Sequence, residues 1–246
     1  MSISATQSEQ RPWEPGLGAE IVVVLLATFG TSGLRALLNL ARSLLDTKPL
    51  NAQQVAIVPS RAPLPLIDIG FQLTSIALVF SWGFLCLYLL KIRLWPVAHL
   101  VHSARLGVGL AALIGIPGLL FYLGALHLGL SKQVIPVPAD SPWWHIGLSV
   151  GFAAANAFSE EVVVVLWLMT RLKSAGVSQV KAIASSALLR GSHHLYQGIS
   201  AGVGNIIMGI VFGYVYHKTN RVWPLIFAHF FIDLVAFVGS VYLNLK

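Results

Sequence analysis

Seven long apolar stretches restrict what this chain can fold into. They lie near residues 20–44, 71–90, 106–130, 145–170, 182–196, 202–216 and 222–243. A helix needs about 20 predominantly apolar residues to cross a bilayer, and it satisfies its backbone polar groups internally. The sequence therefore predicts an all-α fold, a polytopic transmembrane helix bundle with about seven spans, within a range of roughly six to eight.

Composition excludes most soluble classes of protein. Hydrophobic residues make up 56% of the 246 residues and charged residues 10%, against about 25% charged in an ordinary soluble domain. So few charges cannot cover the surface of a water-soluble fold of this length. The net charge of +7 fits basic loops beside a membrane better than nucleic-acid binding, so we expect a lipid bilayer and no nucleic acid as partner.

The charged and polar residues also predict the domain organisation. Residues 1–19 are polar and are predicted to form a disordered cytoplasmic tail, and residues 20–246 are predicted to form a single transmembrane domain. Basic residues mark three loops: Lys91, Arg93 and Arg105; Arg171, Lys173 and Lys181; Lys218 and Arg221. Because basic loops stay in the cytoplasm, we expect a multi-pass protein of the cell membrane with a cytoplasmic N-terminus.

Ionisable residues inside three apolar stretches are the first sign of function. Glu160, Glu161 and Asp233 are the acidic residues that lie within such stretches, together with His194 and His229. A charge at mid-bilayer costs ~2.5–3.5 kcal/mol on insertion scales, so such residues usually face the protein interior and serve function. At a rise of about 1.5 Å per residue they reach overlapping depths, and we expect them to converge on one site.

Helix geometry predicts how these side chains are oriented. His229 and Asp233 are four residues apart and share a helical face. Glu160 and Glu161 are about 100° apart around the axis, so one should face the site while the other meets a structural partner. His193, next to His194, is predicted to point elsewhere and to serve in packing or hydrogen bonding.

Glutamate and histidine in one cavity suit hydrolysis of a peptide bond by water. A carboxylate in a water-accessible pocket of low dielectric can act as a base, and histidine can position water or stabilise an oxyanion. The sequence has neither an H-E-x-x-H zinc helix nor a G-x-S-x-G nucleophile elbow. We therefore expect no cofactor. Zinc remains an alternative, because Glu160, His194 and His229 are all zinc-ligand types.

Three strings around these residues resemble the CPBP family of intramembrane proteases. They are SEEVVVVLWLMTRL (159–172), LLRGSHHLYQG (188–198) and GNIIMGIVFGYVYHKTNRVWPLIFAHFFID (204–233). The family, which includes the type II CAAX prenyl endopeptidases, shows E-E-x-x-x-R, F-x-x-x-H and H-x-x-x-N, or a close variant, in this order. The resemblance places the catalytic motif region at residues 150–240.

The resemblance implies a function and a role for each residue. It implies an intramembrane endopeptidase that acts on a membrane-embedded or lipid-anchored protein or peptide. Glu160 would be the general base that activates water, and His194 would help to hold that water. His229, with Asp233 in place of the asparagine, would stabilise the oxyanion, and Glu161 would orient and balance the site.

The chain departs from the family pattern at two further positions. The arginine of the first motif falls at Val165, and the phenylalanine of the second falls at Arg190. We hypothesise that Arg190 reaches from its own helix to serve as counter-ion to a glutamate. The departures leave open a catalytically inactive scaffold or binding protein on the same fold. A proton- or ion-coupled transporter is less favoured, because the sequence shows no convincing internal repeat.

Overall fold

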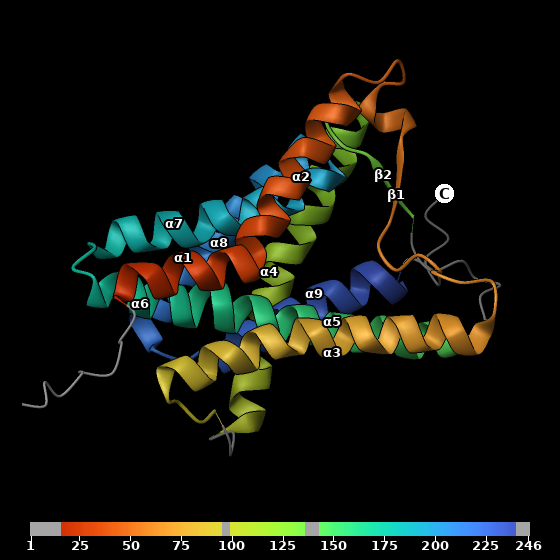
Figure 1. The fold of residues 1–246 in the computed structure, drawn as a ribbon. Coiled ribbons are helices and arrows are strands. Elements are labelled where there is room, and N and C mark those ends of the chain that lie inside the picture. Colours follow the sequence, from red (N-terminus) through yellow and green to blue (C-terminus); the bar gives the residue numbers. More distant parts are fainter. Residues whose placement is uncertain (1–15, 95–98, 136–142, 240–246) are drawn as a thin grey trace, which may run out of the picture.

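A computed structural model describes residues 16–94, 99–135 and 143–239 of the chain, and Figure 1 shows it as a ribbon. Within these ranges the fold is built almost entirely of helices, which confirms the all-α prediction. The helices are α1 (Leu17–Ala27), α2 (Phe29–Leu44), α3 (Pro65–Leu90), α4 (Leu100–His127), α5 (Trp143–Glu160), α6 (Leu168–Ser174), α7 (Gln179–His194), α8 (Ile199–Thr219) and α9 (Trp223–Leu234). Of the tail predicted at residues 1–19, residues 1–15 lie outside the described ranges, and α1 already begins at Leu17.

Shorter elements connect and extend these helices. Two π-helical segments interrupt or extend the long helices, η2 (Glu161–Trp167) and η4 (Val235–Gly239). Two 3-10 turns are η1 (Leu50–Ala52) and η3 (Leu195–Gln197). Segment η2 joins α5 to α6, so these three elements form one continuous helical stretch.

The stretch that carries the two glutamates is the most enclosed of the long helices. In Trp144–Ser174, 83% of the most apolar section is buried, against 11% in α3 and 6% in α4. Helices α3 and α4 are more apolar than this central stretch, yet most of their side chains are exposed. Exposed apolar helices suit contact with lipid, whereas the central helix can hold ionisable groups away from lipid.

The number of spans differs from the predicted seven. Among the described residues, four helical stretches are long and apolar enough to cross a bilayer, or five if the bent pair α1–α2 is one span. The stretch predicted at 182–196 is helical as α7, with 16 residues. The stretch predicted at 222–243 is helical as α9 and η4, an apolar helix over Trp223–Val238, and residues 240–243 lie outside the described ranges. The described part of each helix is about 24 Å long, shorter than a bilayer core of about 30 Å. The prediction of seven full spans is therefore not confirmed.

A bend of 49° separates α1 from α2. The backbone breaks at Thr28, whose hydroxyl donates a hydrogen bond of 2.7 Å to the carbonyl of Val24. Gly30 permits this bend, because a Cβ there would lie 2.6 Å from the carbonyl oxygen of Leu25. Figure 1 shows α2 leaving the line of α1. The bend brings Phe29 against His193 of α7, with ring centroids 4.9 Å apart.

Contacts between loops show that the predicted basic loops share one end of the bundle. Arg171 at the end of α6 donates a hydrogen bond of 2.8 Å to the carbonyl of Leu89, near the end of α3. Trp223 at the start of α9 donates through Nε1 to the carbonyl of Leu94, at 3.2 Å. Arg171 also pairs with Glu20 of α1 at 2.7 Å, so the first helix begins at this same end.

A short parallel strand pair, absent from the predicted fold, joins two distant loops. Strand β1 (Gln54–Ala56) pairs with β2 (Gln133–Ile135). Beside it, the backbone N–H of Lys132 donates to the carbonyl of Gln197 at 2.9 Å. Burial, with the charge of Arg42 nearby, lowers the pKa of Lys132. These contacts connect the loop after α4 to the end of α7.

Candidate active site

The residues predicted to converge do lie together. Glu160 ends α5, His194 ends α7, and His229 lies on α9. The Glu160 Oε1 atom is 3.7 Å from His194 Nε2. Nη1 of Arg190 lies near both remaining residues, donating to Glu160 Oε2 at 3.3 Å and lying 3.4 Å from His229 Nδ1. The predicted convergence of three helices is confirmed, whereas the catalytic role of each residue stays a prediction.

Arg190 is the centre of this cluster and is fully buried. Its Nη2 atom donates to Glu161 Oε1 at 2.6 Å, and its Nη1 donates to Glu160 Oε2. The guanidinium also lies over the ring of Phe212 of α8, 5.4 Å from the centroid. The hypothesis that Arg190 pairs with a glutamate across helices is confirmed, and the arginine contacts both glutamates.

The two glutamates face different partners, as helix geometry predicts. Glu160 directs Oε1 toward the histidines of α7. Glu161 is fully buried, and its Oε1 lies 2.7 Å from His229 Nδ1 and 2.6 Å from Arg190. Glu160 therefore faces the histidine side of the cluster, and Glu161 holds Arg190 and His229 together.

The central helix changes from α-helical to π-helical winding between the two glutamates. Segment η2 begins at Glu161, and its seven residues are all buried. Hydrogen bonds from i to i+5 make a π turn wider than an α turn, and π turns are frequently found at functional sites. Ser186 of α7 donates through its hydroxyl to the carbonyl of Val164 within η2, at 2.8 Å. No local sequence signal predicts this π segment.

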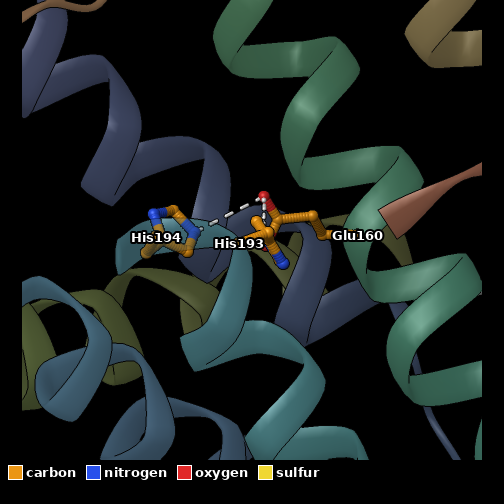
Figure 2. Close-up of side chains that lie close together, drawn as sticks. All are labelled: Glu160, His193 and His194. Atoms are coloured by element: carbon orange, nitrogen blue, oxygen red, sulfur yellow. Dashed lines mark ion pairs between the residues drawn. The ribbon is translucent and has the colours of Figure 1, made fainter. Parts of the chain in front are cut away.

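The prediction that His193 points away from the site is wrong. Its Nε2 lies 3.2 Å from Glu160 Oε1. Its Nδ1 lies 3.0 Å from the carbonyl of Leu189, one turn earlier in α7. Figure 2 shows the rings of His193 and His194 both directed toward Glu160. Because α7 ends at these two residues beside Glu160, both side chains reach one carboxylate oxygen although they are neighbours in sequence.

The set of potential metal ligands consequently differs from the predicted one. Among the described residues, Glu160, His193 and His194 each offer one ligand atom, and these atoms lie within 4.8 Å of one another. His229, predicted as the third ligand, instead directs Nδ1 at Glu161. The structure thus exchanges His229 for His193 in a zinc-type ligand set.

Asp233 completes the cluster on α9. Its Oδ2 lies 3.6 Å from His229 Nε2, which confirms that the two residues share a helical face. The side chain of Asn156 of α5 interacts with that of Asp233. The sequence analysis missed Asn156, although it stands four residues before Glu160 and hence on the same face of α5. The side chains of His194 and Asp233 are 17% and 16% exposed, so they form the least enclosed side of the cluster.

The fold and the cluster together define a class: a helical membrane protein with carboxylates and histidines gathered in its interior. Residues 142–235 match the family model described as type II CAAX prenyl endopeptidase Rce1-like. This segment carries the whole cluster, and the match confirms the resemblance to the CPBP proteases over it. No curated protein and no solved structure matches the chain.

Proposed function

We propose that this protein is an intramembrane endopeptidase that hydrolyses a peptide bond with water activated at Glu160. The observation that supports this most is the meeting of Glu160, His194 and His229 from three helices within one buried cluster. The match of residues 142–235 to a family of endopeptidases favours the same reaction.

The chemistry begins with water held between Glu160 and His194. Glu160 accepts a proton from this water, and the oxygen attacks the carbonyl carbon of the substrate. The C–N bond then breaks, and the proton on Glu160 passes to the leaving amine. A positioned acid–base of this kind contributes about 10²–10⁴-fold to rate.

His229 is placed to stabilise the negative charge on the tetrahedral intermediate. Its Nδ1–H donates to Glu161, so a proton on Nε2 is also needed for donation to an oxyanion. Asp233, 3.6 Å from Nε2, favours that doubly protonated ring by its charge. The side chain of Asn156 on α5 interacts with Asp233, so a neutral amide lies beside the position at which the family has its asparagine.

We propose a substrate that is embedded in the membrane or anchored to it by a lipid. The cluster lies in the interior of a bundle with apolar exposed helices, so a substrate reaches it most readily from the bilayer. The matched family is named for prenylated CAAX proteins, and a prenylated C-terminal peptide is the first substrate to test.

The decisive experiment compares two glutamate variants. Glu160→Gln removes the base while preserving shape, and we expect cleavage of a lipid-anchored peptide to fall by about 10²-fold or more. Asp46→Asn is the matched control, because Asp46 is exposed in the loop after α2 and its Oδ1 accepts from Thr47 and Lys48 of that same loop. An exposed carboxylate of this kind contributes about 0–1 kcal/mol, so this variant should cleave like the wild type.

An inactive scaffold is the competing interpretation, favoured by Val165 and Asp233 where the family has arginine and asparagine. It predicts that the wild type cleaves no membrane peptide and that Glu160→Gln leaves its cellular function intact. The position of Arg190 beside both glutamates weighs against it, because a cation is present where the motif arginine is missing.

A further inference from the structure

We propose that Lys132 and Arg42 bind the phosphate of an anionic phospholipid whose acyl chains lie against the apolar ends of α2 and α4. The inference goes beyond the proposed function, because it concerns a second site with its own ligand. Lys132 is a buried cation that the proposed reaction does not use. Lipid binding is measured without a peptide substrate, so only the effect of the lipid on cleavage rests on the proposed function.

Lys132 is buried without an acidic partner. Only 7% of the residue is exposed, and among the residues that the structure describes no carboxylate forms an ion pair with it. The charge that acts on it is another cation, Arg42. A long cationic side chain buries its apolar stem and keeps its charged end near the surface. Because a charge out of water is costly without a partner, this position favours an anion from outside the chain.

A series of hydrogen bonds brings the two cations to one place. The Gln53 side chain donates to the carbonyl of Ser43, next to Arg42, at 2.8 Å. The carbonyl of Gln53 accepts from the backbone N–H of Gln133, next to Lys132, at 2.9 Å. Figure 1 shows the end of α2 and the strand pair at the same end of the molecule. An anion between the two cations would offset the burial and the like charge that lower the pKa of Lys132.

Two buried hydroxyls beside Lys132 are also unpaired. Within the described ranges, the Oγ atoms of Ser131 and Ser200 are buried and have no hydrogen-bond partner. Both residues belong to the junction of the loop after α4 with the start of α8, where Ser131 pairs with Gly198 and Ser200 donates its backbone N–H to Leu130. Buried polar groups are normally paired. This junction therefore has unmet donors next to an ammonium group, and phosphate oxygens accept from both kinds of donor.

Exposed leucines make a lipid the source of the phosphate. Leu38 and Leu45 are 62% and 88% exposed. They stand four residues before and three residues after Arg42, and so on the same face of α2. Leu128, four residues before Lys132, is 71% exposed. A free anion would leave these apolar surfaces uncovered, whereas the acyl chains of a phospholipid would cover them.

The backbone connects this lipid site to the candidate active site. The N–H of Lys132 donates to the carbonyl of Gln197 at 2.9 Å, and Gln197 is only three residues after His194. Gly198 has a φ of 130°, and a Cβ there would lie 2.9 Å from the Cα atom of Ser131. A lipid that fixes Lys132 therefore also fixes the segment after His194, and we expect it to raise cleavage.

The test is lipid binding by the purified full-length protein. Protein in detergent is stripped of lipid, titrated separately with phosphatidylglycerol, phosphatidylcholine and inorganic phosphate, and followed by native mass spectrometry. We expect one phosphatidylglycerol molecule to be retained under conditions that remove phosphatidylcholine, and an excess of inorganic phosphate should not displace it. Equal retention of the two lipids would overturn the inference. Displacement by inorganic phosphate would also overturn it, because the ligand would then be a free anion.

Variants assign the site. Lys132→Gln removes the buried cation and should weaken phosphatidylglycerol binding by roughly tenfold or more. Arg42→Gln, at an exposed position, should weaken it by about fivefold. Arg61→Gln is the matched control, because it removes one exposed positive charge from the loop after β1 and should bind like the wild type. Equal weakening by Lys132→Gln and Arg61→Gln would show a diffuse attraction and contradict the assignment.

Thermal unfolding without lipid separates binding from a structural role. A neutral side chain needs no counter-ion, so Lys132→Gln should unfold at the temperature of the wild type or above it. A different outcome would identify an internal partner. If Lys132→Gln and Asp140→Asn both unfold at a lower temperature, then Asp140, which lies outside the described ranges, is the counter-ion and the inference is overturned.

Cleavage is then compared in phosphatidylcholine vesicles with and without phosphatidylglycerol. The wild type and Arg61→Gln should cleave a lipid-anchored peptide faster with phosphatidylglycerol, whereas Lys132→Gln should cleave at one rate in both. An equal response of Lys132→Gln would contradict the connection to the active site. A protein that retains the lipid but cleaves no peptide supports the lipid site and contradicts the peptidase. A protein that cleaves but retains no lipid does the reverse.

Discussion

Arg190 is the residue that most determines whether this cluster can exist. It is fully buried and pairs with Glu161 at 2.6 Å and with Glu160 at 3.3 Å. Two adjacent carboxylates in a place of low dielectric would repel each other and would each lack the solvation that water provides. A single planar guanidinium, with several donors in fixed geometry, can bond to both.

Replacing Arg190 should therefore destabilise the fold as well as the site. Arg190→Met leaves buried carboxylates without a cation, and we expect a loss of about 3–5 kcal/mol in unfolding free energy. Thermal unfolding in detergent measures this, with Arg35→Met, at an exposed position on α2, as control. The double variant Arg190→Met with Glu161→Gln should recover part of the stability, since it removes one unpaired charge. Equal unfolding temperatures for Arg190→Met and Arg35→Met would contradict this account.

At the scale of elements, the π segment η2 (Glu161–Trp167) begins at the second glutamate. Glu160 itself keeps α-helical dihedrals (φ -64°, ψ -46°), so the regular step of about 100° to Glu161 is kept. From Glu161 onward the turn is wider, and its carbonyls no longer follow the α pattern. The hydroxyl of Ser186 donates to one of them, that of Val164, and so connects α7 to the altered turn.

Removing the Ser186 hydroxyl should loosen this connection. Ser186→Ala takes a buried donor from a carbonyl, and we expect a loss of about 1 kcal/mol, or roughly 2–4 °C in unfolding temperature for a chain of this size. Ser174→Ala is the matched control, because its hydroxyl bonds an exposed carbonyl one turn earlier in its own helix. Cleavage by the Ser186→Ala variant should fall even where the protein stays folded. If both the unfolding temperature and the cleavage rate were unchanged, the hydrogen bond from Ser186 to Val164 would have no role in positioning the site.

At the scale of the whole molecule, the basic loops lie at the same end of the bundle as the start of α1. Arg171 contacts both Leu89 of α3 and Glu20 of α1 there. Trp223 contacts Leu94 at the same end. The strand pair β1–β2 stands apart from these contacts and joins the loop after α2 to the loop after α4. Since basic loops remain in the cytoplasm, we propose that the end with Arg171 is cytoplasmic and that β1–β2 faces the opposite side.

Cysteine labelling tests this orientation. The native Cys86 is fully buried, which keeps background reaction low. A cysteine at exposed Ala52, beside β1, should react with an impermeant maleimide in intact cells. A cysteine at exposed Ser174, at the end of α6, should react only after the cells are permeabilised. The reverse pattern would reject the proposed orientation while leaving the fold unchanged.

The tertiary contacts explain which sequence predictions succeed. Apolar runs predict helices because backbone groups in lipid must be satisfied within the helix, and i to i+4 spacing predicts the His229–Asp233 pair because it depends only on local geometry. The span number is not confirmed at α7 and α9, since apolar composition alone does not decide whether a helix crosses lipid or packs within a bundle. The orientation of His193 fails for a related reason: it depends on where α7 ends and on the approach of Glu160.

The sequence by itself determines that the chain is helical, that ionisable groups lie within apolar segments, and that Glu160, His194 and His229 are candidates for one site. Those properties follow from composition and from spacing within single helices. Only the tertiary structure decides that Arg190 holds both glutamates, that η2 widens the central helix, and that His193 joins Glu160 and His194. Each of these depends on side chains from different helices meeting at one depth, and no spacing along a single helix encodes that.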